Sequence, residues 1–173
     1  STVDSALDAR WEVRLSQTGP SGEVRANRKS VLIGQIGAAV RLLFPQLPSN
    51  GVRVGDSWED SAVYPVQLDA FDASESSVRT SKASPGALPG SVRIESVERL
   101  TRNGKATQGG RTMTVSGVGG RQVTYEFSPE GRVTTLRARD TLDLQVAIPG
   151  SPDPVSVRQR STVTARLRGS SPG

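Results

Sequence analysis

Cysteine and histidine are both absent from this 173-residue sequence. The chain therefore cannot form disulfides or use a thiol nucleophile, and it lacks the ligands of the usual zinc sites and the commonest proton shuttle at neutral pH. Only seven aromatic residues are present, which leaves few rings to stack on sugars or bases. No apolar run approaches the roughly 18 residues that span a bilayer. These absences argue against a metal, a cofactor and covalent catalysis.

Lysine is also scarce: the sequence has 3 Lys and 19 Arg. Against 17 acidic residues they give a net charge of +5. Most of that excess lies from Gly131 onward, where the sequence has seven arginines and three acids. One interpretation is a surface that faces an anion. Nucleic-acid surfaces usually add lysines and interleaved aromatics, and this last quarter has no aromatic residue, so no nucleic acid is expected as a partner.

The first 44 residues predict strands followed by a helix. Ala9 to Leu15 alternates apolar and charged residues, which is typical of a half-buried strand. Gly19 to Gly22 predicts a turn, and Glu23 to Ser30 predicts a returning strand or a polar approach. The apolar residues then recur at helical spacing, which predicts an amphipathic helix over Val31 to Phe44 (31–44) with Ser30 as its cap.

The stretch from Arg41 to Trp58, RLLFPQLPSNGVRVGDSW, is expected to organise the fold because it joins the helix to the sheet. Val52 and Val54 predict a short strand, and Gly55-Asp56 predicts the turn that closes it before Trp58 covers the core. The alternative for this corner is an acidic knot able to attract calcium, made of Asp56, Glu59 and Asp60.

The middle of the chain changes in amino-acid composition. Val63 to Leu68 predicts a strand in which Pro65 favours a sheet edge or a bulge. Residues 70–90 are rich in Ser, Ala, Gly and Pro, and predict a long mobile excursion that could include a short strand at Val78 to Thr80. The tail at 169–173 is expected to fray.

Beyond residue 90 the sequence predicts a series of hairpins. Asn103-Gly104 is a strong turn signal, and the glycines at 117–120 indicate a further turn or bulge. Val123, Tyr125 and Phe127 share one face of a strand and are expected in the core. The other predicted turns lie at 128–131 and 149–154, and the other predicted strands begin at Val92, Thr112, Val133, Leu142 and Val155.

These segments amount to about eight to ten strands and one helix, in a single β-rich domain over 1–173. The sheet is expected to be antiparallel because the sequence has no βαβ alternation. The predicted fold class is mainly β (α+β), as a curved antiparallel sheet or half-barrel packed on the helix at 31–44. A closed barrel and a β-sandwich with the helix at one end are the alternatives.

The sequence gives little support to catalytic motifs. One G-x-S-x-G match exists, at Gly169 to Gly173, but it lies in the tail that is expected to fray. No serine lies three residues before a lysine, and the Gly109 to Gly120 stretch has neither a Walker nor a GxGxxG pattern. Glycoside chemistry through Glu126 with Glu130, or Glu95 with Glu98, stays open. Because Glu126 alternates with two apolar aromatics, it is expected to point outward, and the chain is expected not to be an enzyme.

Three stretches carry a likeness to known proteins. They are LFPQLPSNGVRVGDSW at Leu43 to Trp58, in which V-x-V-G-D-S-W is the most specific part, GGRTMTVSGVGG, and VTYEFSPEGRVTTLRARDTLDL at Val123 to Leu144. With them the chain resembles a family of bacterial secreted or lipoprotein-type domains of unknown function. The resemblance implies a cell-envelope, periplasmic or secreted location and supplies no catalytic residues. The strand-rich plan is also similar to envelope lipid-carrier half-barrels.

Two binding surfaces are predicted, and they lead to two functions. The first function is non-enzymatic envelope binding or scaffolding, with an apolar or lipid ligand between helix and sheet. The second is a structural or assembly module that self-associates or docks on an anionic partner through an arginine face of the last strand. The ligand would contact Leu32, Ile36, Val40, Phe44 and Trp58, and the arginine face would consist of Arg158, Arg160, Arg166 and Arg168, beside Arg137 and Arg139.

Overall fold

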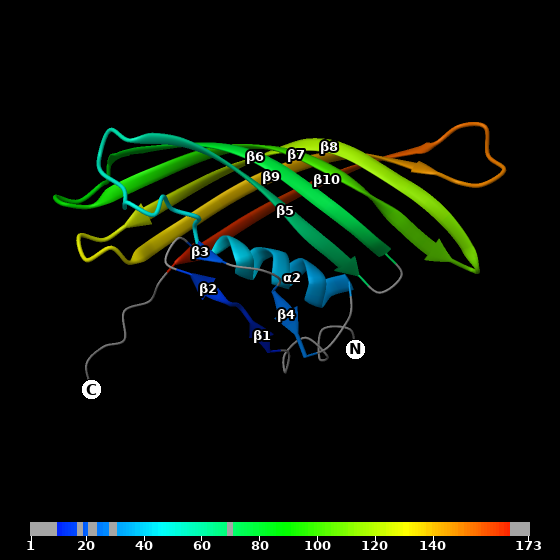
Figure 1. Ribbon diagram of the computed structural model, residues 1–173, viewed down its shortest axis with the longest axis horizontal. Helices are drawn as coiled ribbons and strands as arrows, with labels where there is room; N and C mark the ends of the chain where they lie inside the picture. The colour runs from blue at the N-terminus through cyan, green and yellow to red at the C-terminus, as the bar shows by residue number, and fades with distance from the viewer. Residues whose placement is uncertain (1–9, 17–18, 21–23, 28–30, 69–70, 167–173) are drawn as a thin grey trace.

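Six long strands form one curved antiparallel sheet in the computed structural model, which describes residues 10–16, 19–20, 24–27, 31–68 and 71–166 (Figure 1). Each strand pairs with its neighbour in sequence, in the order β10-β9-β8-β7-β6-β5. The mainly β, antiparallel prediction is confirmed. The strands are β5 (Ser57–Leu68), β6 (Phe71–Pro85), β7 (Val92–Gln108), β8 (Arg111–Phe127), β9 (Val133–Ala147) and β10 (Val155–Arg166).

A short helix, α2 (Val31–Leu42), lies on the concave side of the sheet (Figure 1). The helix ends two residues before the predicted Phe44. The N–H groups of Leu43 and Phe44 bond to carbonyls only three residues earlier, and Pro45 cannot continue the helical hydrogen bonding. The predicted cap, Ser30, lies outside the described residues.

Four two-residue strands form two small ribbons before the helix. In the first ribbon β1 (Trp11–Glu12) pairs with β4 (Arg25–Ala26), and in the second β2 (Leu15–Ser16) pairs with β3 (Gly19–Pro20). The predicted single strand over Ala9 to Leu15 is therefore wrong, because its described part contributes to two separate pairings. The predicted returning strand is confirmed only as β4.

The predicted excursion over 70–90 is wrong for most of its length, because Phe71–Pro85 forms β6 between β5 and β7. Side chains at 72–83 of β6 alternate between exposed and buried, although the buried positions hold small or polar residues such as Ala73, Ser77 and Ser81. A strand of this kind lacks the apolar alternation from which strands are predicted. The β6–β7 connection is compact, since Ser91 Oγ accepts the Leu88 N–H at 2.9 Å.

Two glycine signals mark positions inside strands and not turns. β7 continues through Asn103-Gly104, and β8 continues through 117–120, so the main sheet has six long strands where about eight to ten were predicted. A Cβ on Gly104 would lie 2.3 Å from that of Ala73, so this glycine lets two backbones approach closely. The turn between β7 and β8 falls at Gly109-Gly110, where φ is +56° and +74°.

The apolar core lies on the concave face of the sheet. Val123, Tyr125 and Phe127 are buried in it, as predicted. The segment between α2 and β5 closes this core, because apolar side chains on it pack against the buried cluster. The cluster is Ala83, Ile94, Val123, Tyr125, Phe127, Leu136 and Ala138, and the residues that close it from this side are Leu42, Leu47, Val52 and Trp58.

The Arg41 to Trp58 stretch differs from prediction in one respect. Val52 to Val54 forms no strand, since Arg53 begins a turn in which Asp56 N–H donates to the Arg53 carbonyl at 3.1 Å. Asp56 Oδ2 in return accepts the Arg53 N–H at 2.7 Å, which confirms the predicted Gly-Asp corner. Pro65 lies in β5, an edge strand, also as predicted.

Candidate functional site: arginines on two faces of one sheet

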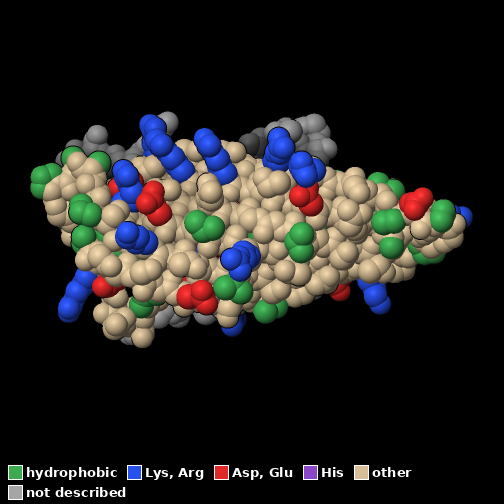
Figure 2. Space-filling view, turned by 90° about the horizontal axis from the view of Figure 1, so that it is seen from above, with side chains coloured by type: hydrophobic (Ala, Val, Ile, Leu, Met, Phe, Trp, Pro, Cys, Tyr) green, Lys and Arg blue, Asp and Glu red, His purple; other side chains and the backbone are tan. Residues whose placement is uncertain are grey.

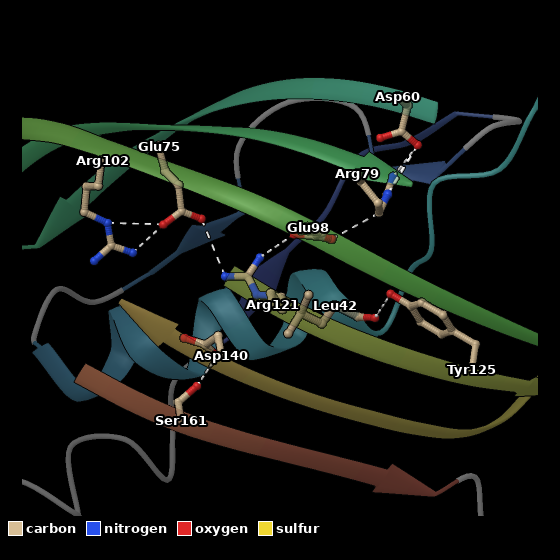
Figure 3. Close-up of polar contacts among 10 residues, drawn as sticks. All are labelled: Leu42, Asp60, Glu75, Arg79, Glu98, Arg102, Arg121, Tyr125, Asp140 and Ser161. Carbon is tan, nitrogen blue, oxygen red and sulfur yellow. Dashed lines mark hydrogen bonds and ion pairs between the residues drawn. The ribbon is translucent and has the colours of Figure 1, made fainter. Parts of the chain in front are cut away.

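A row of paired charges crosses the middle of the concave face, and is named here the ionic cluster (Figure 3). Register brings its members together from β5, β6, β7 and β8, because side chains of alternate residues point to the same face. The ion pairs are Arg79 with Asp60 at 2.8 Å and with Glu98 at 3.5 Å, Arg121 with Glu98 at 3.1 Å and with Glu75 at 3.5 Å, and Arg102 with Glu75.

The ionic cluster is withdrawn from water. Glu98 is 4% exposed and Glu75 is 5% exposed, so each carboxylate needs its arginines to remain charged there. Burial by itself lowers the pKa of Arg79, but the hydrogen bond and charge of Asp60 outweigh burial and raise that pKa overall. Every carboxylate of the cluster is engaged, which leaves none positioned as a free general base.

Two contacts tie the C-terminal end of α2 to the sheet. The guanidinium carbon of Arg41 lies 3.4 Å from the centre of the Tyr64 ring on β5, a cation–π contact. Burial lowers the pKa of Arg41. Tyr125 O–H donates to the Leu42 carbonyl at 2.9 Å, and burial of the phenol raises the pKa of Tyr125.

The predicted apolar-ligand residues are only partly brought together. Trp58 packs against the core cluster, whereas Ile36, Val40 and Phe44 are half-buried outside it, and the side chain of Leu32 lies outside the described part of the chain. An open pocket of about 280 Å³ lies beside Trp58 at the edge of the sheet. Its lining is mixed in polarity: Gln46, Leu47, Pro48, Ser49, Trp58, Glu59 and Asp60.

The predicted acidic knot is not formed. Asp56 bonds to the Arg53 amide, and Asp60 points to Arg79 on the concave face. Glu59 is exposed and, as the neighbour of Asp60 in β5, points to the opposite, convex face. Among the described residues, no group of three or more acidic side chains is placed to hold a metal ion.

Four exposed arginines gather on the convex face of β9 and β10, and are named here the arginine ridge: Arg137, Arg139, Arg160 and Arg166. Arg139 pairs across the strands with Thr162, and Arg137 with Thr164, so Arg160 and Arg166 are their diagonal neighbours. None of the four makes an ion pair with a described residue. Figure 2 shows basic side chains along one long margin of this face.

The arginine ridge is related to, but differs from, the arginine face that the sequence predicted. Arg160 and Arg166 are placed as expected, and Arg137 and Arg139 lie beside them. Arg158 is neutralised, because its Nε donates to Asp143 Oδ1 at 2.5 Å. That hydrogen bond lowers the pKa of Asp143. Arg168 lies outside the described residues.

Sequence reasoning missed the ionic cluster. Its members are dispersed over four strands, and only the register places them in one row. One signal was available within β6, where Glu75 and Arg79 share the alternation of Ala73, Ser77 and Ser81, the buried side of the strand. Asp140, which accepts the Ser161 O–H, lies across from Arg121 at the border of the cluster (Figure 3).

Comparisons with protein-family models, curated proteins and solved structures found no match. Within the described residues, no helix has the length and apolar character needed to cross a membrane. The candidate site therefore rests on its own geometry: a neutral, buried ionic cluster on the concave face, and on the convex face an arginine ridge that makes no ion pair with the described part of the chain.

Proposed function

We propose that this chain is a non-enzymatic binding domain whose anionic partner docks on the arginine ridge. The observation that carries the proposal is a difference in ion pairing between the arginines of the two faces. The arginines of the ionic cluster all contact carboxylates, whereas the four of the ridge contact none among the described residues. The ridge arginines are diagonal neighbours within reach of one another, so their like charges repel, and an anionic partner would relieve that repulsion.

Arginine suits this role because its planar guanidinium can bind a carboxylate or phosphate through two parallel hydrogen bonds. Exposed arginines also steer an anion during its approach. We further propose that α2 and the curved sheet act together as a half-barrel-like scaffold for the ridge. The Tyr125–Leu42 hydrogen bond and the Arg41–Tyr64 contact support that packing.

The cell-envelope location implied by the resemblance stays a prediction. So does an apolar ligand between Ile36, Val40, Phe44 and the sheet. The ligand alternative has less support than the ridge, because paired charges occupy the middle of the concave face. An apolar ligand bound there would displace water from these charges without replacing its hydrogen bonds, so the binding free energy would gain little.

The test is binding of poly-L-glutamate to two variants with equal net charge. In the ridge variant Arg137, Arg139, Arg160 and Arg166 become Ser. In the matched control four other exposed arginines become Ser, namely Arg53, Arg99, Arg111 and Arg132, none of which makes an ion pair with a described residue. We expect the ridge variant to bind about 100-fold more weakly and the control to change by less than about threefold at physiological salt. Equal weakening of both variants would refute a localised site.

A further inference from the structure

The arginine ridge borders an unpaired sheet edge. Within the described residues β10 pairs with β9 alone, so the backbone N–H and C=O groups of its other side have no strand partner. β10 runs for 12 residues without proline or glycine. The opposite edge strand, β5, is protected by Pro65 and by the contact of Tyr64 with Arg41 of the helix.

The two faces of β10 have different chemistry along this edge. Its convex side carries the ridge residues Arg160 and Arg166. Its concave side carries Val155 and Val157, which are 48% and 44% exposed although they alternate with polar residues. A strand laid along β10 would meet positive charge on one face and apolar surface on the other.

We propose that the free edge of β10 accepts an extended segment of an acidic partner protein as a seventh strand. This inference rests on the proposed function and specifies the partner. The added segment would alternate acidic residues, beside Arg160 and Arg166, with apolar residues, beside Val155 and Val157. Main-chain hydrogen bonds would provide affinity, and the alternation would fix which face of the segment is turned to the arginines.

Charge selects this occupant over a second copy of the chain. Pairing two β10 edges would bring the arginines of both ridges side by side, where their mutual repulsion disfavours the dimer. An acidic strand reverses the sign of the same interaction. A lipid or polysaccharide surface could neutralise the ridge, but it would leave Val155 and Val157 and the edge amides uncovered.

The test uses two peptides of the length of β10 and identical composition. One alternates Glu with Val, and the other gathers the same residues into two blocks. We expect the alternating peptide to bind the full chain about tenfold more tightly, because only it can place every Glu on one face of a strand. We also expect it to slow hydrogen exchange at alternate amides of β10, since only every second N–H of an edge strand points outward.

Proline variants of β10 separate edge pairing from charge. Ser161→Pro and Thr162→Pro are made in parallel, because neighbouring residues direct their N–H groups to opposite sides of the strand. One substitution breaks a hydrogen bond to β9 and lowers the melting temperature. The other blocks the outer edge without breaking a backbone hydrogen bond to β9, and Ser161→Ala controls for the side-chain hydrogen bond to Asp140 that Ser161→Pro also removes. We expect that second variant to bind the alternating peptide about tenfold more weakly and to bind poly-L-glutamate as the wild type does.

Each outcome has a defined meaning. Equal affinity for the two peptides, or unchanged affinity after the edge is blocked, would overturn strand addition while leaving the ridge proposal intact. Unchanged poly-L-glutamate binding by the ridge variant would overturn the proposed function and this inference with it. A dimer in sedimentation that the edge block dissociates would identify a second copy as the occupant and overturn the acidic partner.

Discussion

The two faces of the sheet use arginine in opposite ways. On the concave face Arg79, Arg102 and Arg121 are mostly buried, and each contacts at least one carboxylate. On the convex face the arginine ridge is exposed and has no acidic partner among the described residues. The environment, and not the residue type, decides the role, because a buried charge must be neutralised within the chain whereas an exposed charge is solvated until a partner arrives.

The largest expected effect tests whether the concave charges depend on one another. Glu98→Gln removes a buried carboxylate that neutralises both Arg79 and Arg121, and we expect it to lower the free energy of unfolding by about 3 kcal/mol. The control is Glu95→Gln, on the same strand but on the exposed convex face, with an expected change below about 0.5 kcal/mol. Urea unfolding measures both variants, and similar losses would erase the distinction between the faces.

A smaller effect separates the faces by packing and not by charge. Gly119 and Gly120 are adjacent in β8, so a side chain added at one would point to the opposite face from a side chain added at the other. A Cβ on Gly119 would lie 2.1 Å from the Thr141 carbonyl oxygen, so Gly119→Ala is expected to cost about 1–3 kcal/mol. A Cβ on Gly120 would meet the Glu98 carbonyl oxygen at 3.4 Å, so Gly120→Ala is expected to be neutral or slightly stabilising. Thermal unfolding of the two variants would contradict this account if their order were reversed.

The smallest effect on stability concerns the one neutralised arginine next to the ridge. Because the pKa of Asp143 is lowered by its hydrogen bond from Arg158, the pair contributes stability above the ordinary Asp pKa of about 4, and loses it as the pH falls through the lowered value. The Arg158 and Asp143 side chains are 61% and 48% exposed, so water screens the pair and Asp143→Asn should barely change the melting temperature.

The same substitution sharpens the contrast between paired and unpaired arginines. Asp143→Asn frees Arg158, which would then extend the arginine ridge along β10. We expect tighter binding of poly-L-glutamate by about two- to fivefold, with a steeper dependence on salt. Gln145→Asn, an uncharged change on the same face of β9, serves as the control. Unchanged affinity in Asp143→Asn would indicate that Arg158 lies outside the binding surface.

The sequence predicted those elements whose apolar residues recur at the spacing of a helix or a strand. The helix over 31–42 and the burial of Val123, Tyr125 and Phe127 follow from spacing alone. β6 could not be recognised, because its buried face holds small and charged residues that only neighbouring strands can pair. Gly104 and Gly119 resemble turn residues in sequence, but their role is set by backbones that approach from other strands.

The same limit applies to the candidate site. Alternation placed Arg160 and Arg166 on one solvent face, and proximity to Arg137 and Arg139 followed from the hairpin at 149–154. The pairing of Arg158 with Asp143 depends on the exact register of that hairpin, and the ionic cluster depends on three registers at once. One-residue shifts would move each charge to the opposite face, so register had to be known before pairing could be assigned.

The sequential order of the strands has a consequence for how this sheet is made. Every strand from β6 to β10 joins the strand that precedes it in the chain, so each addition closes only a short loop. Of the six strands of this sheet β5 leaves the ribosome first, and every later strand can pair with the outer edge of a sheet that has already formed. β10 is the last strand of the described sheet, so its edge would be the final template of this growth, and a partner strand would continue in trans the process that assembled the sheet in cis.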